Sequence, residues 1–184
     1  MHTVALRDVE PQAWRNGGGV THELLAWPRA DDWLLRISVA TIDRDGAFSA
    51  FPGVERWFTV LEGPGVTLDF AHGQVRLGPG HAPLPFAGEA APMCTLTAGT
   101  TRDLNLMYRR GAAKATLAIA AAGSELMGPT LWRGIYAAEA LTLDISGVTH
   151  HVAPATLAWS DDSDTHHWRR RHDVAAAWWL TLAP

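Results

Sequence analysis

The chain has 184 residues, of which 47% are hydrophobic and 18% charged, and its formal net charge is −4. These values are typical of a folded globular protein with a substantial core, arranged as one domain or two small halves. The negative charge balance offers no electrostatic footprint for nucleic acid or an anionic membrane surface, so we expect neither as a partner.

The single cysteine, Cys94, excludes a disulfide framework within the chain and suits a reducing compartment. We expect its thiol to be a small buried side chain, because nothing nearby in the sequence would activate it. No signal-peptide pattern is present, and no window approaches the roughly 20 apolar residues of a membrane span. The sequence therefore predicts a soluble, cytoplasmic protein.

The first marked pattern is W-R-N-G-G-G-V-T-H-E at 14–23. Its three consecutive glycines, at 17–19, oppose a helix and allow the backbone to approach a ligand or a neighbouring strand closely. The segment lacks the Lys-Ser/Thr pair of a phosphate-binding loop and the glycine spacing of a dinucleotide fold. A ligand contact and a simple sharp bend both remain open.

Residues 33–40 alternate between apolar and polar side chains, which predicts a strand. One face carries Arg36 and Ser38, and the other carries three aliphatic residues. An arginine in mid-strand is usually solvated. If this face lines the interior of a small barrel, however, the guanidinium needs an anionic partner, which a bound carboxylate would supply.

The stretch 45–65 is the centre of the first half. D-G-A-F-S-A-F-P-G-V-E-R at 45–56 predicts an aromatic-rich turn, and the apolar run at 57–61 predicts a buried strand. The ending V-L-E-G-P-G at 60–65 resembles the first conserved motif of cupins, which are small β-barrels. A metal-dependent cupin carries two histidines and a glutamate just before it. This window has no histidine, so the resemblance implies a barrel without the metal.

Further alternating segments at 66–70, 74–77 and 102–109 predict more strands. The Pro/Gly-rich stretch 78–88 resembles the second cupin motif, again without its histidine. In the last strand Asn105 and Met107 share one face, and we predict that this face forms part of a pocket wall.

The second half repeats the first loosely. V-T-L-D-F at 66–70 matches L-T-L-D-I at 141–145, 75 residues further along. Such a repeat of strand–turn–strand units predicts a duplicated barrel. The Ala-rich tract 114–122 has helical propensity, but the flanking turns and the repeat favour a strand.

Histidines gather late in the chain, at positions that include 166, 167 and 172. No carboxylate lies between these three, and the arginines at 169–171 would repel a cation, so we predict no metal site. The segment 161–172 favours a solvated loop, or a contact surface if the protein dimerises. No G-x-S-x-G elbow surrounds Ser49, which argues against a serine hydrolase.

Several blocks, taken in order, resemble the HutD/Ves family: the segments at 14–23, 33–40 and 45–56, L-E-G-P-G at 61–65, and R-D-L-N-L-M-Y-R at 102–109. The resemblance implies an all-β bicupin, in which two cupin-like antiparallel barrel or jelly-roll halves pack together without the usual metal and without a cofactor. The first half would span residues 1–111 and contain the pocket, and the second would span 112–184.

The same resemblance implies an association with bacterial histidine utilisation, as a regulatory or intermediate-sensing factor rather than a pathway enzyme. The implied ligand is a small acid such as N-formyl-L-glutamate, urocanate or formiminoglutamate. A carboxylate ligand requires guanidinium groups, neutral hydrogen-bonding groups and an apolar wall. The family blocks supply all three kinds, and we assign no residue a catalytic role. The predicted ligand-binding set is Asn16, Gly17, Gly18, Gly19, Thr21, Arg36, Phe48, Ser49, Phe51, Arg56, Asn105 and Met107.

Two other hypotheses stay open. The protein could be a metal-independent isomerase, epimerase or hydrolase, with Glu55 and Tyr108 as acid–base candidates, although Tyr108 has the opposite strand parity from Asn105. It could also act through protein contacts made by the His/Arg-rich loop 166–172. A homodimer is our default expectation.

Overall fold

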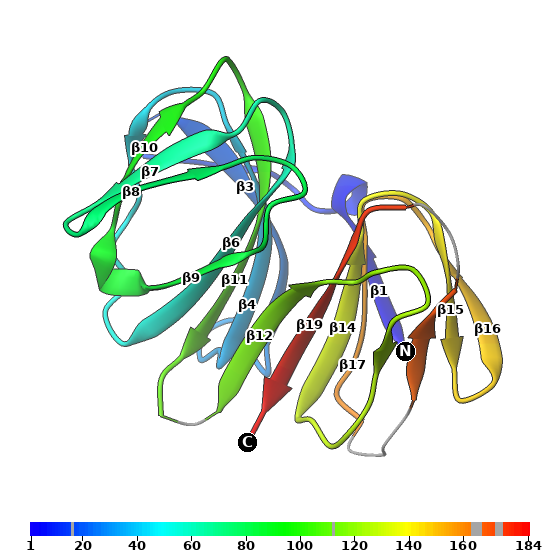
Figure 1. The fold of residues 1–184 in the computed structure, drawn as a ribbon. Coiled ribbons are helices and arrows are strands. Elements are labelled where there is room, and N and C mark those ends of the chain that lie inside the picture. Colours follow the sequence, from blue (N-terminus) through cyan, green and yellow to red (C-terminus); the bar gives the residue numbers. More distant parts are fainter. Residues whose placement is uncertain (16, 112, 163–166, 172–174) are drawn as a thin grey trace. The chain divides into compact units, whose positions relative to one another are not determined.

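The computed structural model describes residues 1–15, 17–111, 113–162, 167–171 and 175–184, and it is drawn in Figure 1. The chain divides into two compact units: Glu10–Ala112, and Met1–Val9 together with Ala113–Pro184. Regular structure over the described residues consists of strands and two short 3₁₀ turns, which confirms the predicted all-β class. Within this part of the chain, no helix has the length and apolarity that crossing a membrane requires.

The unit Glu10–Ala112 consists of two antiparallel sheets (Figure 1). The six-stranded sheet has the order β2 (Gln12–Ala13), β3 (Gly19–Trp27), β4 (Leu35–Ile42), β11 (Thr101–Arg109), β6 (Val54–Glu62) and β9 (Leu84–Ala87). The four-stranded sheet has the order β5 (Gly46–Ala47), β10 (Met93–Leu96), β7 (Val66–Phe70) and β8 (Gly73–Leu77). The 3₁₀ turn η2 (Gly88–Ala90) follows β9.

The core of this unit forms between the two sheets. Phe58 and Val60 of the larger sheet pack with Leu68 and Cys94 of the smaller one, and all four are almost completely buried. Their alternation along the strands places every second side chain in this layer, as expected for sheets that bury one face. Cys94 is therefore a buried apolar-like residue, as its surroundings in the sequence suggested.

The second unit has the same two-sheet plan. Its larger sheet has the order β1 (His2–Ala5), β17 (Thr156–Ser160), β14 (Trp132–Ala137), β19 (Ala177–Ala183) and β12 (Lys114–Ile119). The smaller sheet has the order β13 (Glu125–Leu126), β18 (Trp168–Arg170), β15 (Leu141–Ile145) and β16 (Val148–Val152). The 3₁₀ turn η1 (Leu6–Asp8) follows β1. Its core includes Ile135, Leu143 and Trp168.

The topology confirms the predicted duplication. The order β4-β11-β6-β9 in the first unit corresponds to β12-β19-β14-β17 in the second, and β5-β10-β7-β8 corresponds to β13-β18-β15-β16. The Ala-rich tract forms strand β12, because its alternate residues Ala115 and Leu117 are buried while their neighbours are exposed. Each unit is a two-sheet jelly roll rather than a closed barrel.

Candidate ligand-binding cavity

A cavity of about 640 Å³ lies within the unit Glu10–Ala112. This volume falls within the range of about 300–1,000 Å³ that is usual for small-molecule sites. The wall comes from strands of the larger sheet and from the aromatic-rich turn. The lining residues are Gln12, Ala13, Trp14, Arg15, Thr21, Arg36, Ser38, Ala40, Ile42, Ala47, Phe48, Ser49, Ala50, Phe51, Arg56, Phe58, Asn105 and Met107.

The polar part of this wall is set by strand register. Met107 on β11 pairs with Arg36 on β4 and with Arg56 on β6, so these three side chains form one row on the same face of the sheet. The adjacent row consists of Ser38, Asn105 and Phe58. Two consecutive rows of one sheet face therefore supply six lining side chains.

Arg56 is the most strongly buried charge in the wall, with only 5% of its surface exposed. Its Nη2 donates a hydrogen bond of 2.9 Å to Asn105 Oδ1, whereas its Nε has no hydrogen-bond partner among the residues that the structure describes. Burial, followed by the nearby charge of Arg36, lowers the pKa of Arg56 to about 10. The guanidinium is therefore protonated at neutral pH despite its poor solvation.

Three aromatic rings surround the Arg56 guanidinium. Its Cζ lies 5.0 Å from the ring centre of Phe48, 5.6 Å from that of Phe51 and 5.2 Å from that of Phe86. Such contacts stabilise a desolvated cation in part. No carboxylate among the described residues forms an ion pair with it. A buried cation without a counter-ion is costly, so this position is suited to an anion.

Arg36 is in a different state. Its Nε donates a hydrogen bond of 2.5 Å to Glu23 Oε2, and about a fifth of its side chain is exposed. The sequence predicted that an interior Arg36 would require an anionic partner. Glu23, on strand β3, provides one from within the chain.

The glycine run is close to a strand rather than to the cavity. A Cβ on Gly19 would lie 2.3 Å from the carbonyl oxygen of Thr41, so β3 and β4 can approach here only with glycine at this position. The neighbouring Trp14 lines the cavity, and its Nε1 donates a 2.7 Å hydrogen bond to Thr21 Oγ1. The glycine run was predicted to let the backbone approach a ligand or a neighbouring strand closely, and at Gly19 the neighbour is strand β4.

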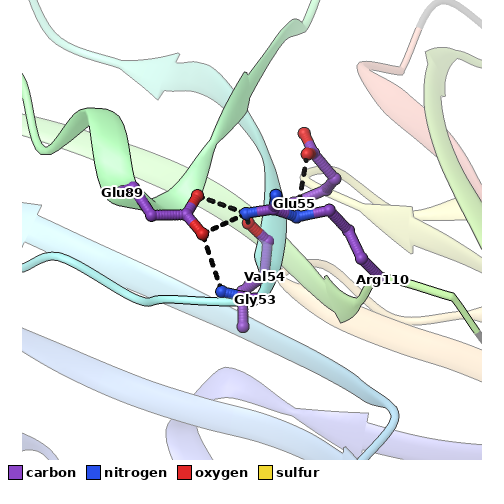
Figure 2. Close-up of polar contacts among 5 residues, drawn as sticks. All are labelled: Gly53, Val54, Glu55, Glu89 and Arg110. Atoms are coloured by element: carbon purple, nitrogen blue, oxygen red, sulfur yellow. Dashed lines mark hydrogen bonds and ion pairs between the residues drawn. The ribbon is translucent and has the colours of Figure 1, made fainter.

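The aromatic-rich turn is braced by polar contacts, drawn in Figure 2, among residues that do not line the cavity. Glu89 accepts a 2.7 Å hydrogen bond from the backbone N–H of Gly53 and a second from Arg110, which also pairs with Glu55 at 3.2 Å. The Gly53 N–H and the Arg110 side chain lower the pKa of Glu89 to about 2. This network fixes the turn that carries Phe51.

A buried acid lies on the same face of β11 as Asn105. Asp103 is completely buried, its Oδ2 accepts a 3.2 Å hydrogen bond from Thr101 Oγ1, and its Oδ1 has no hydrogen-bond partner in the described part of the chain. Burial raises the pKa of Asp103 to about 8, against the opposing effect of the Thr101 hydrogen bond. Burial, followed by the charges of Asp103 and Asp45, raises the pKa of the Cys94 thiol to about 12.

The structure brings most of the predicted ligand-binding residues together. The members that line the cavity are Thr21, Arg36, Phe48, Ser49, Phe51, Arg56, Asn105 and Met107. Gly17, Gly18 and Gly19 do not line it, and Asn16 lies outside the described residues. That these side chains contact a ligand stays a prediction.

Other lining residues lie outside the predicted set. Ser38 was detectable, because it shares strand parity with Arg36. Gln12 and Arg15 carried no comparable signal, since their position depends on the pairing of β2 with β3. Glu23 was missed for a similar reason, because its contact with Arg36 crosses between strands.

The residues behind the other hypotheses lie elsewhere. Glu55 and Tyr108 are register partners on β6 and β11, and neither lines the cavity. In the described ranges, no group of three or more His, Cys, Asp or Glu side chains is arranged to hold a metal ion. The solvated loop predicted within 161–172 is wrong for Trp168–Arg170, which form strand β18 with Trp168 and Arg170 buried. The residues at 166 and 172 are outside the described part of the chain.

Comparison with known proteins gives matches along most of the chain. A family model described as HutD matches residues 6–178. Protein Ves of Citrobacter koseri is 40% identical over 117 residues, which cover 62% of this chain and 61% of that protein. An uncharacterized 21.2 kDa protein in the hutC 3′ region of Pseudomonas putida is 38% identical over 109 residues, 55% of each chain. The matches thus span less than two thirds of these relatives.

Solved structures share the fold over the full chain. A conserved protein of unknown function from Pseudomonas aeruginosa has a TM-score of 0.90 at 24% identity, covering 100% of this chain and 98% of that one. HutD from Pseudomonas fluorescens has a TM-score of 0.87 at 22% identity, covering 99% and 97%. A cupin 2 conserved barrel domain protein from Leptotrichia buccalis has a TM-score of 0.59 at 12% identity, covering 100% and 96%. These likenesses confirm the cupin-like fold.

Proposed function

The chain belongs to the HutD family, and from that premise we propose that its N-terminal cavity binds a small carboxylate metabolite and thereby modulates histidine utilisation. The proposed ligands are acidic intermediates of histidine degradation, namely N-formyl-L-glutamate, urocanate or a related acid. The protein would act in the cytoplasm, where these acids are produced. A relative in Pseudomonas putida is described by its position beside hutC, which is in keeping with this role.

The observation that carries the proposal is the state of Arg56. Its guanidinium is buried and protonated, Asn105 accepts a hydrogen bond from one of its nitrogens, and its Nε meets no acceptor within the described ranges. A ligand carboxylate would supply the missing acceptor and counter-charge together. Hydrogen bonds between ionised groups are roughly twice as strong as neutral ones, and a guanidinium binds a carboxylate with defined geometry.

The rest of the wall suits the remainder of such a ligand. Thr21, Ser38 and Ser49 bring hydroxyl groups that can donate to or accept from a formyl or amide group. Phe51 and Phe58 provide apolar surface, which excludes water and so strengthens the polar contacts. The chemistry required is binding and orientation alone, without a bond being made or broken.

The test is isothermal titration of the purified protein with N-formyl-L-glutamate, with L-glutamate and urocanate as comparisons. We expect saturable binding that discriminates among these acids. Arg56→Gln should weaken it by about 10- to 150-fold, corresponding to the 1.5–3 kcal/mol of a hydrogen bond to a charged group. Arg102→Gln, which removes an arginine paired with Glu62 at 3.1 Å at an exposed position, is the matched control. Absence of binding for all three acids would contradict the proposal.

An enzymatic role has less support from the geometry. Its acid–base candidates, Glu55 and Tyr108, do not line the cavity, so a bound acid would not meet them. Chromatography of each acid after incubation with the protein would detect turnover. A product whose formation is lost in Tyr108→Phe would favour the enzyme instead.

A further inference from the structure

We propose that Glu23 sets the charge selectivity of this cavity. By holding Arg36 in an ion pair, it leaves Arg56 to provide the positive charge in the interior, so the cavity accepts one buried carboxylate per ligand. The inference rests on the proposed function and specifies which acids fit the site.

The two arginines belong to one row of the sheet. Arg36 and Arg56 pair with Met107 from opposite sides, so their backbones lie two strand spacings apart, about 9.6 Å. Both side chains line the cavity. If both charges were uncompensated, the wall would present two cationic groups and would favour a ligand with two anionic groups.

Glu23 removes one of these charges. It is the register partner of Ser38 on β4, two residues from Arg36, and diagonal neighbours on one sheet face lie within reach of long side chains. The resulting contact joins Glu23 Oε2 to Arg36 Nε at 2.5 Å. The register of β3 shifts between Glu23 and Leu25, so the residue opposite Arg36 itself is Ala26. This register shift, a β-bulge, therefore lies directly after Glu23.

Burial makes this contact more than a surface pair. The side chains of Arg36 and Glu23 are only 20% and 27% exposed, so the pair is screened less than the exposed pairs of the same unit. Arg56 has no such partner among the described residues. The cavity thus contains one compensated and one uncompensated guanidinium in the same row.

A consequence follows for acids with two carboxylates. One carboxylate can bind Arg56, whereas the second gains little at Arg36, because Glu23 opposes it. The second group is better placed toward Arg15, which lines the cavity and is exposed. Its contribution there should fall as salt is added.

The experiment uses two probes of equal length: glutarate, with two carboxylates, and its half-amide glutaramate, with one. We expect the wild type to bind both with affinities within about threefold. Glu23→Gln should tighten glutarate by on the order of tenfold, as expected for removing one charge about 10 Å away at an effective dielectric constant near 20. The affinity for glutaramate should rise less in the same variant, because this probe has only one carboxylate. Glu62→Gln, which breaks the exposed pair with Arg102, is the matched control and should change neither affinity.

A double-mutant cycle completes the test. Arg36→Gln leaves the Glu23 charge uncompensated and should weaken glutarate, and Glu23→Gln combined with Arg36→Gln should restore an affinity close to that of the wild type. The double variant leaves no unpaired charge, so it remains informative if Glu23→Gln folds poorly.

The outcomes separate the two proposals. Wild-type binding of the probes with no selective gain of glutarate in Glu23→Gln, or with an equal gain in Glu62→Gln, overturns the role of Glu23 and leaves the carboxylate site standing. If neither the wild type nor any variant binds these probes or N-formyl-L-glutamate, the carboxylate site itself fails, and the role of Glu23 fails with it.

Discussion

Arg56 and Asn105 are joined by a 2.9 Å hydrogen bond across a diagonal of strands β6 and β11. The register partner of Arg56 is Met107, so Asn105 reaches it from the neighbouring row of the same sheet face. The bond fixes the plane of the guanidinium and occupies one nitrogen of the fork, while Nε stays without a partner. Asn105 therefore orients the group that we propose as the carboxylate anchor.

Replacing Asn105 by Leu should destabilise the protein, because it leaves a buried charged donor unsatisfied. The expected loss is about 1–3 kcal/mol in the free energy of unfolding, measured by urea denaturation. Gln74→Leu, at a strand position where the amide bonds to exposed Asp69, is the control and should cost less than about 0.5 kcal/mol. Equal effects of the two substitutions would contradict the role given to Asn105.

Gly88→Ala should disturb the turn that carries Phe51. A Cβ at this position would lie 2.5 Å from the Phe51 carbonyl oxygen, and the Phe51 N–H donates a 3.0 Å hydrogen bond to Gly88 O. The turn must move to make room, so we expect a lower melting temperature together with weaker binding of the acid. Gly78→Ala, where an added Cβ meets nothing within 4 Å, should leave both unchanged.

Asp103 should make stability depend on pH across the neutral range. Its pKa is raised by burial to about 8 in the folded protein, from an ordinary value of 3.8. Between these values Asp103 is ionised in the unfolded chain while it retains its proton in the folded one, so its contribution to stability is fully present below about pH 4 and is lost as the pH rises to about 8. Asp103→Asn should remove this decline, which amounts to a few kcal/mol in order of magnitude. A parallel pH profile for variant and wild type would contradict it.

Cys94 should be unreactive in the native protein. It is 1% exposed, and burial raises the pKa of its thiol to about 12, so hardly any thiolate exists at pH 8. A thiol-specific chromogenic disulfide should therefore label no cysteine under native conditions and one equivalent in denaturant. Rapid native labelling would show that the interior between the two sheets opens readily.

Much of this fold could be predicted because strands encode their two faces with a period of two residues. The alternation at 33–40 put Arg36 and Ser38 on one strand face, and that at 102–109 put Asn105 and Met107 on one face; all four line the cavity. The 75-residue repeat predicted two similar units. The glycine, proline and aromatic composition of 45–56 likewise predicted the turn that contains Phe48 and Phe51. These features are local, so they are visible in a single sequence.

What could not be predicted depends on pairing between distant segments. Glu23 meets Arg36 because β3 pairs with β4 with a shifted register, and no local pattern reveals that shift. Asp103 has the same parity as Asn105, but its burial without a basic partner goes against the general preference of carboxylates for water. The glycine run was included in the predicted ligand-binding set. Gly19 is instead explained by the close approach of β3 to the Thr41 backbone, which leaves no space for a Cβ.

The pairing of β1 with β17 has a consequence for the order in which the chain can fold during synthesis. His2 lies opposite Trp159, so strand β1 has to wait for a partner made more than 150 residues later. Residues 10–112 are all synthesised well before then and can complete both of their sheets, because domains generally fold as units as they emerge. Until β17 is made, the short strand β1 lacks this partner and presents an unpaired edge, and closing that long loop should be among the last and slowest steps of folding.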